Sequence, residues 1–295
     1  MDVSHINALS REMSLTPSQI EAVAHLLDEG ATIPFIARYR KEATGSLDEV
    51  VVTQVRDRLE QLAELQKRRQ TILKSLGDNG HLTDDLQTAV EAAGTLSELE
   101  DIYLPYRPKR RTRATVAREK GLEPLAERLF AQNGCQPQEA AKGYSDGAKA
   151  VETADEALSG ARDIMAEWVA ENARAREKMR LLFATASTIK SKIAAGKEAE
   201  GAKYRDYFDW EEPAAKAPSH RILAMRRGER EDILNLTITP PEENAREILE
   251  TLFVTGSGED AEQVRMAVQD SYKRLLSRAM ETEIQIGRAS CRERV

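Results

Sequence analysis

The 295-residue sequence is poor in aromatic residues, since Phe, Trp and Tyr together make up only 5% of it. Strands favour aromatic and β-branched side chains, whereas Ala, Leu, Glu, Arg and Lys, which favour helices, are abundant here. Charged residues make up 32% of the chain, above the ~25% usual for soluble domains. The composition predicts a mainly α protein, long enough for two domains or one large one.

Cysteine and histidine are also scarce. The two cysteines, Cys135 and Cys291, lie far apart, which excludes a disulfide framework or a zinc site of known spacing. The four histidines are scattered, so we expect neither a metal site nor another cofactor. No apolar run approaches the ~18 residues of a membrane span, and residues 1–13 lack the apolar core of a signal peptide. These absences predict a cytoplasmic protein without a membrane partner.

The motifs that accompany catalysis are missing as well. The carboxylates are dispersed along the chain, whereas RNase-H-like catalysis needs clustered acids that hold divalent metal. The glycine-rich residues 255–258 lack the lysine of a phosphate-binding loop, and His220 has no evident nucleophile partner. We therefore expect no catalytic residues and no enzymatic activity. The net charge of −7 excludes a uniformly nucleic-acid-coating protein but is compatible with a local basic patch.

The last ten residues, IGRASCRERV, have three arginines and no helical apolar repeat. They resemble the translation of a common sequencing adapter, followed by an in-frame stop codon. The other interpretation is a natural basic tail. We expect residues 286–295 to be an artefactual tail, so that the natural gene continues, and we leave them out of the fold prediction.

Helix signals dominate the remaining chain. Thr16, Pro17 and Gln19 predict a capped helix start with proline in the first turn. Apolar residues at three- and four-residue steps predict a long spine helix over 47–76, about 45 Å long at ~1.5 Å per residue. Residues 152–195 are predicted to be largely helical, and residues 105–115 a loop.

One strand is predicted, over residues 233–238, which read ILNLTI. A strand needs partners, and because none is evident nearby we expect it to pair with chain absent from this sequence. The composition changes after Gly196. The predicted domains are therefore a helical amino-terminal domain (1–196) and a second helical lobe with one small β element (197–285).

Three stretches carry a family resemblance: ATIPFIARYRKEATGSLDE (31–49), LEDIYLPYRPKRRTRATVAREKGLEPL (99–125) and SHRILAMRRGEREDILNL (219–236). Together with their order and spacing, they make residues 1–285 resemble the amino-terminal region of the bacterial Tex family, which is similar to a eukaryotic elongation factor. The resemblance implies a cytoplasmic, RNA-binding transcription accessory protein whose helical amino-terminal region includes a helix-turn-helix-like unit. In the family an RNase-H-like fold, helix-hairpin-helix elements and an OB-fold domain come next. No residues here match them, so the family's main RNA-binding determinants cannot be assigned to this chain.

A basic stretch within the second of these segments is the first candidate site. Seven cations lie between Pro105 and Lys120: Arg107, Lys109, Arg110, Arg111, Arg113, Arg118 and Lys120. Arginines bind phosphate bidentately, and the ring of Tyr106 could stack on a base. The alternative is a structural loop whose arginines pair with the protein's own carboxylates. The candidate nucleic-acid-binding residues here are Arg107, Lys109, Arg110, Arg111 and Arg113.

Arg38, Arg40 and Lys41 form the second candidate site. A helix, turn and helix over 17–39 could present them to a nucleic-acid groove. The alternative, which we favour, is a packed corner in which the arginines pair with Glu42, Asp48 or Glu49. A helix-turn-helix shape also occurs in proteins that bind no DNA.

Three functions remain open from sequence. The first is a nucleic-acid-binding transcription accessory module, which predicts an exposed basic loop, with RNA and DNA not distinguished. The second is a structural or protein-interaction scaffold that could contact RNA polymerase, which predicts arginines paired to Asp and Glu. The third, a nuclease fragment, has no candidate metal site. We rank them in that order.

Overall fold

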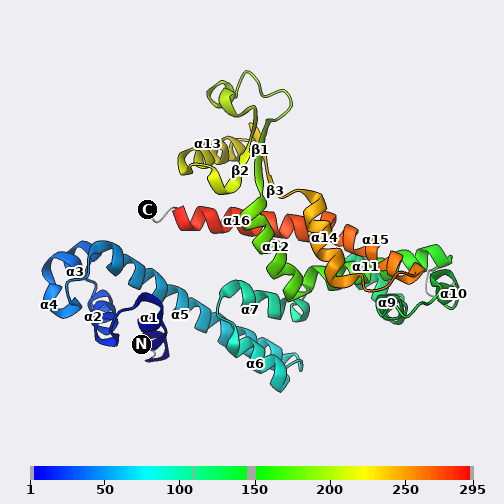
Figure 1. Cartoon of the computed structure of the whole chain (residues 1–295), viewed down its shortest axis with the longest axis horizontal. Helices are drawn as coiled ribbons and strands as arrows, with labels where there is room; N and C mark the ends of the chain where they lie inside the picture. The colour runs from blue at the N-terminus through cyan, green and yellow to red at the C-terminus, as the bar shows by residue number, and fades with distance from the viewer. Residues whose placement is uncertain (1–2, 109, 145–150, 293–295) are drawn as a thin grey trace. The chain divides into compact units, whose positions relative to one another are not determined.

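The computed structural model describes residues 3–108, 110–144 and 151–292, and gives only the backbone at 3, 4 and 285–292. Contacts between residues divide the chain into two compact units, Met1–Tyr106 and Arg107–Val295, which we describe separately. Helices predominate in both (Figure 1), which confirms the predicted mainly α fold. This division does not test the predicted domain boundary at 196/197, which stays a prediction.

Unit 1 is entirely helical in its described part. Its elements are α1 (Val3–Met13), α2 (Pro17–Asp28), α3 (Ile33–Tyr39), α4 (Lys41–Thr44), α5 (Glu49–Asp78), α6 (Asp84–Ala92), α7 (Leu96–Tyr103) and the short 3₁₀ helix η1 (Leu104–Tyr106). The capping box that the sequence predicts at Thr16 and Gln19 is present. The spine helix starts two residues later than predicted, because the side chain of Asp48 accepts the N–H of Val51 at 2.8 Å and caps it.

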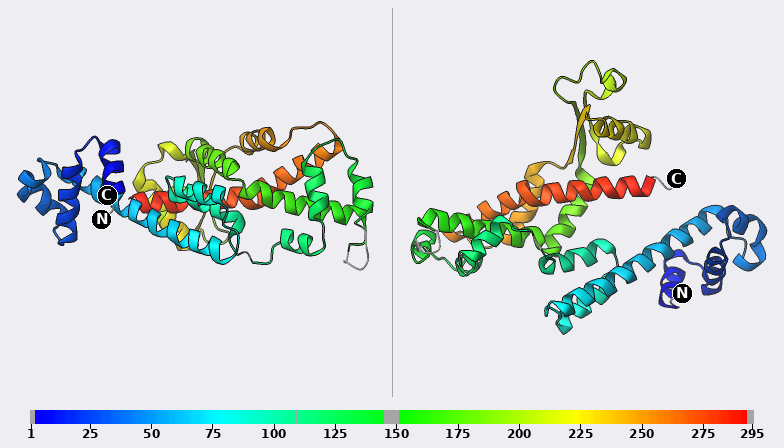
Figure 2. Two further views of the ribbon diagram at one scale, coloured as in Figure 1. Left: turned by 90° about the horizontal axis from the view of Figure 1, so that it is seen from below. Right: turned by 180° about the vertical axis from the view of Figure 1, so that it is seen from behind.

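Helix α5 carries two small hydrophobic cores. Val52 and Val55 pack with α1–α3 near its start, and Ile72 and Leu76 pack with α6 and α7 near its end. Figures 1 and 2 show α1–α4 gathered at one end of α5, and α6 and α7 at the other. The long helix is therefore the spine of unit 1, because it is the element that both cores share.

Unit 2 holds the largest core. Its helices are α8 (Arg113–Glu119), α9 (Glu123–Phe130), α10 (Pro137–Lys142), α11 (Ala154–Glu171), α12 (Ala173–Ala186), η3 (Ala202–Tyr207), η4 (Ala214–Lys216), α13 (Ser219–Arg230), α14 (Glu242–Phe253), α15 (Glu259–Ser271), the π-helical turn η5 (Tyr272–Leu276) and α16 (Ser277–Arg292). Helix α11 lies at the centre, packed against α8, α9 and α15. Phe183 of α12 and Met165 of α11 are fully buried in this core.

A three-stranded antiparallel sheet corrects the strand prediction. It consists of β1 (Thr188–Ile193), β2 (Asp209–Pro213) and β3 (Leu234–Thr239), in the order β2-β1-β3. The expectation that the 233–238 strand pairs with absent chain is therefore wrong, since Ile238 lies opposite Ile189 of β1. The predicted helix over 152–195 was also wrong at its end, where TIKSKI alternates buried and exposed residues as strands do.

The side chains of Gln132 and Asp260 hydrogen-bond the α9–α10 turn of unit 2 to the α14–α15 connection and to the first turn of α15. Asp260 is 1% exposed, and its carboxylate accepts the backbone N–H of Gly134 at 2.7 Å and of Cys135 at 3.0 Å. Gln132 donates to the carbonyl of Phe253 at 2.7 Å and accepts from two N–H groups of the same connection. These contacts join segments more than 120 residues apart in sequence.

Helix α16 runs into the predicted artefactual tail, with a helical backbone as far as Arg292. The side chains of residues 285–292 and all of 293–295 lie outside the described part of the structure. The origin of residues 286–295 therefore stays a prediction. Within the described residues, no helix combines the length and apolarity needed to cross a lipid bilayer.

Candidate nucleic-acid interface

The basic segment, residues 107–113, begins unit 2. Arg107, Arg110, Arg111 and Arg113 are all exposed, whereas Lys109 lies outside the described residues. Arg107 and Arg110 form no ion pair with any residue that the structure describes. The segment is a shorter loop than predicted, because the Thr112 hydroxyl accepts the N–H of Thr115 at 3.0 Å and starts α8 at Arg113.

The cations further along are partly paired within the protein. Arg118 contacts Glu167 at 2.5 Å and Glu123 at 3.0 Å. Burial acts to lower the pKa of Arg118, but its bonds to these two carboxylates raise it above the ordinary value, so the group is held charged. Arg111 lies 2.8 Å from Glu119, and both side chains are more than half exposed, so that pair contributes little to stability. The predicted alternative of internal pairing thus describes Arg118 well and Arg111 only weakly.

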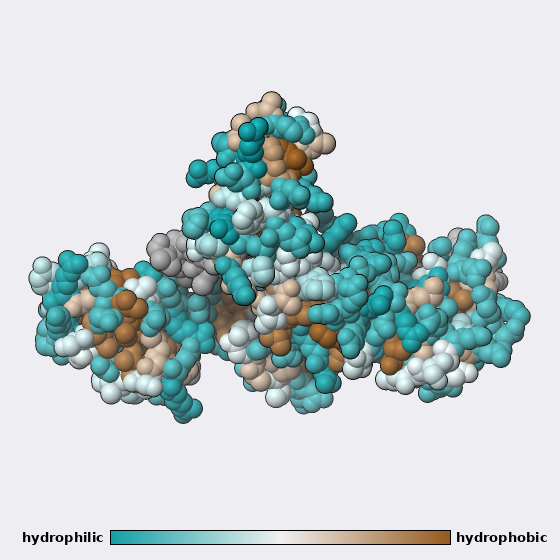
Figure 3. All heavy atoms as spheres, turned by 45° about the horizontal axis from the view of Figure 1, so that its top comes forward, coloured by the Kyte–Doolittle hydropathy of each residue, from teal (hydrophilic) through white to brown (hydrophobic). Residues whose placement is uncertain are grey.

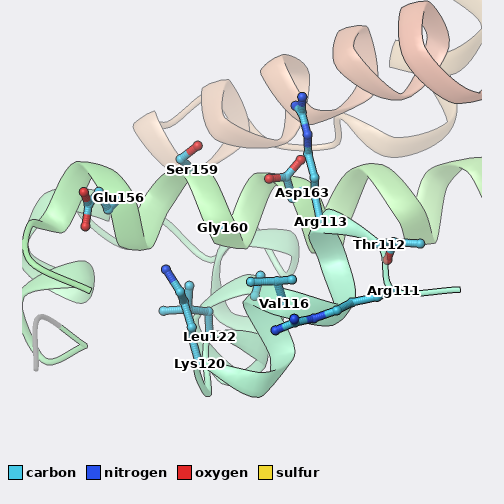
Figure 4. Close-up of a pocket in the computed structure, with 11 residues that line it drawn as sticks. Arg111, Thr112, Arg113, Val116, Lys120, Leu122, Glu156, Ser159, Gly160 and Asp163 are labelled. Atoms are coloured by element: carbon cyan, nitrogen blue, oxygen red, sulfur yellow. The ribbon is translucent and has the colours of Figure 1, made fainter. Parts of the chain in front are cut away.

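A groove of about 730 Å³ lies beside the basic segment, between α8 and α11 (Figure 4). The two helices approach closely at Gly160, where an added Cβ would lie 3.4 Å from Cβ of Ala117 in α8. It would also lie 2.4 Å from Cδ1 of Leu122, which comes after α8. Arg111 and Lys120 extend from the α8 side, and Glu156 and Ser159 from α11. The groove therefore has a cationic wall and a polar, partly acidic wall over an apolar floor.

Arg113 and Asp163 both line this groove, and in Figure 4 the side chain of Arg113 runs alongside that of Asp163. Asp163 also contacts Arg274 of η5 at 2.9 Å, and Arg274 contacts Asp270 at 2.6 Å. Burial raises the pKa of Asp163 above its ordinary value of 3.8, although Arg274 and Arg113 act to lower it. Among the described residues, Asp163 pairs with Arg274, whereas Arg113 forms no ion pair and acts on Asp163 only through its charge. Arg113 is therefore exposed and unpaired, as Arg107 and Arg110 are.

The second candidate site lies on unit 1, at the end of α3 and the start of α4. Arg38 contacts Glu49 at 3.1 Å, and Arg40 contacts Glu42 at 3.9 Å. Lys41 is exposed and forms no ion pair with a described residue. The arginines therefore pair as the scaffold alternative expects. The helix-turn-helix interpretation of α2 and α3 stays a prediction.

The groove includes residues that the sequence analysis did not single out. Glu156, Ser159, Gly160 and Asp163 succeed one another along α11 at short helical steps, which places them on one face of a helix. That spacing was a usable signal. The packing of α8 against this face of α11 could not be predicted, because it depends on contacts between residues about 45 positions apart.

The described part of the chain contains no cluster of three His, Cys, Asp or Glu side chains placed to hold a metal ion. Two of the four arginines of α13 are engaged locally. Arg221 contacts Glu212 at 2.6 Å and lies 4.8 Å from the centre of the Trp210 ring. Arg226 contacts Glu229 at 2.7 Å. These two arginines therefore have structural contacts, whereas Arg227 and Arg230 are exposed.

The fold and its basic segment define a mainly helical protein with a small sheet and a local concentration of exposed arginines. Comparison with family models matches residues 3–77 to the Tex-like protein N-terminal domain and residues 132–288 to the Tex central region-like domain. The chain belongs to the Tex family, as its three sequence segments indicated.

Curated relatives agree with this family. The chain is 46% identical over 251 residues to Protein YhgF of Escherichia coli, covering 83% of this chain and 32% of that protein. It is 46% identical over 238 residues to the transcriptional accessory protein Tex of Neisseria gonorrhoeae, covering 81% and 31%. A human protein named S1 RNA-binding domain-containing protein 1 is 25% identical over 248 residues, covering 81% and 24%. The chain thus spans about a third of the length of its bacterial relatives.

Proposed function

We propose that this chain is the amino-terminal part of a cytoplasmic transcription accessory protein and contacts nucleic acid, RNA in particular, through its basic segment. The observation that supports this proposal is that Arg107 and Arg110 are exposed and form no ion pair among the described residues. Arginines free of carboxylates can bind phosphate oxygens bidentately without first breaking an internal pair. We also propose that the chain catalyses no reaction itself.

The family's names support the proposal at a coarse level. One relative is named a transcriptional accessory protein and another an S1 RNA-binding domain-containing protein. The S1 name describes the whole of a much longer relative. The basic segment of this chain would therefore add one nucleic-acid contact to those made by other parts of the whole protein. Phosphate contacts fix position without reading sequence, and DNA binding therefore remains part of the proposal.

A scaffold that contacts other proteins, RNA polymerase among them, is the second candidate function. The observation that favours it is the pairing of Arg118 with Glu167 and Glu123, and of Arg38 with Glu49. Under this alternative the basic segment would serve packing, and removing its free arginines would leave nucleic-acid affinity unchanged.

The test is a salt titration of binding to fluorescent single-stranded RNA and duplex DNA. The variant Arg107→Ala/Arg110→Ala is compared with Arg227→Ala/Arg230→Ala, which removes the same charge from exposed residues of α13 in the same unit. Loss of two phosphate contacts should reduce the slope of log affinity against log salt by about 1.4 to 1.8, at ~0.7 to 0.9 per contact. Equal effects of the two variants would show a net-charge effect, and no binding by the wild type would favour the scaffold.

A further inference from the structure

Unit 1 exposes two aromatic side chains side by side on α3. Phe35 is 41% exposed and Tyr39 is 69% exposed, and their ring centres lie 5.6 Å apart. The Arg40 guanidinium lies 5.6 Å from the centre of the Phe35 ring. Large aromatic side chains are costly to leave in water, and adjacent exposed ones mark interaction sites more often than isolated ones do. Figure 3 shows apolar side chains exposed together on the lobe formed by the N-terminal helices.

A hollow of about 420 Å³ adjoins Phe35, between the end of α2 and the start of α3. Leu26, Ala31 and Phe35 supply apolar lining, and one residue of each charge, Glu29 and Arg40, lines it as well. The chain turns into the hollow at Gly30, whose φ of +84° favours glycine. A Cβ built on Gly30 would meet no atom within 4 Å, so the entrance is open. We call this hollow and the two aromatic rings the Phe35 surface.

The charges around the Phe35 surface decide which kind of partner it fits. Three cations, Arg38, Arg40 and Lys41, are balanced by three carboxylates, Glu29, Glu42 and Glu49. Binding to a polyanion draws its free energy from an excess of cations that displaces the phosphates' counterions, and here there is no excess. Protein interfaces, in contrast, combine Phe, Tyr and Arg at their centre with charges of both signs at the rim.

The cations Arg40 and Lys41 can still favour a partner that carries a carboxylate. Arg40 and Glu42 are 3.9 Å apart and about half or more exposed, and such a pair is weak enough to exchange partners. Lys41 comes directly after Arg40, is exposed, and has no ion pair with a described residue. A carboxylate arriving from outside would therefore find Arg40, which lines the hollow, and the exposed Lys41 next to it in the sequence.

We propose that the Phe35 surface docks a segment of a partner protein that inserts an aliphatic side chain into the hollow and presents a carboxylate to Arg40 and Lys41. Tyr39, whose ring centre lies 5.6 Å from that of Phe35, extends the apolar surface beside the hollow. This interface belongs to unit 1, whereas the basic segment belongs to unit 2.

The test uses a random-peptide phage library selected on the full 295-residue chain, with counter-selection on Tyr39→Ala. Synthetic copies of the enriched peptides are then titrated by fluorescence anisotropy. We expect enriched peptides in which an aliphatic residue is followed closely by Asp or Glu. Tyr39→Ala should weaken their binding at least tenfold, and Lys41→Glu should weaken acidic peptides but not their amide counterparts.

Leu181→Ala is the matched control, because Leu181 is 65% exposed on α12 in the other unit, and it should leave binding unchanged. Tyr39 is mostly exposed, so its replacement keeps the fold, which far-UV circular dichroism checks. Enrichment of basic peptides, no Tyr39-dependent peptide, or displacement of bound peptide by single-stranded RNA would each overturn the proposal. The last outcome would assign the aromatic pair to base stacking instead.

Discussion

Replacing Asp260 by alanine should destabilise unit 2 by about 2 to 4 kcal/mol. Its carboxylate accepts two N–H groups of the α9–α10 turn, from Gly134 and Cys135, and is 1% exposed. A buried donor that loses its acceptor costs about 1 to 3 kcal/mol. The lower half of that range applies because these two bonds are only partly buried. Both N–H groups contact the same oxygen, Oδ2. The single amide oxygen of Asp260→Asn can therefore accept both, and this variant should lose less stability than Asp260→Ala.

Urea unfolding followed by tryptophan fluorescence is the assay, because Trp168 and Trp210 both lie in unit 2. A lower midpoint at an unchanged slope would report lost stability. Glu262→Ala is the control, since Glu262 lies in the first turn of the same helix but pairs only with Arg265 at the surface, and it should cost under ~1 kcal/mol. A loss below about 1 kcal/mol for Asp260→Ala, or equal losses for both variants, would refute the reasoning.

Three further predictions concern the α8–α11 groove. Glu119→Gln frees Arg111 from its 2.8 Å partner, and a salt titration of RNA binding should then steepen by about 0.7 to 0.9. The pKa of Asp163 is raised by burial and lowered by Arg274, so Arg274→Ala should raise it further in a carboxyl NMR titration. Because that folded-state pKa exceeds the unfolded one, the stability that this proton contributes is fully present below the unfolded pKa and is lost as pH rises through the folded value. Gly160→Val should destabilise the protein by about 1 to 3 kcal/mol in urea, because even the first added carbon lies 2.4 Å from a facing leucine carbon.

Local signals in the sequence predicted the helices well, because a helix is defined by contacts within a few residues. The cap at Thr16 and the apolar repeat of α5 are examples. The repeat placed the start of α5 two residues early because Leu47 continues the apolar pattern and packs in the first core, although it lies before the cap. The structure assigns the cap to Asp48.

The sheet was only partly predictable because its pairing is not local. Strand β1 contains Lys190 and Lys192, which favour helices, and it comes directly after a helical stretch. Its strand character depends on pairing with β2 on one side and, on the other, with β3, which lies more than 40 residues later. The candidate sites show the same limit. The sequence identified the cations of the basic segment, whereas the carboxylates that pair with Arg118 and the exposure of Phe35 emerged only from the fold.

The shared spine of unit 1 restricts how its length can change. Each residue added to a helix lengthens it by ~1.5 Å and rotates the rest of the helix by about 100°. One residue inserted between Leu62, which packs with the first core, and Leu65, which packs with the second, would turn the second core's stripe away from α6 and α7. Two whole turns, about seven residues, would restore the phase to within ~20°. The length of α5 can therefore change only by a near-whole number of helical turns if both cores are to stay packed.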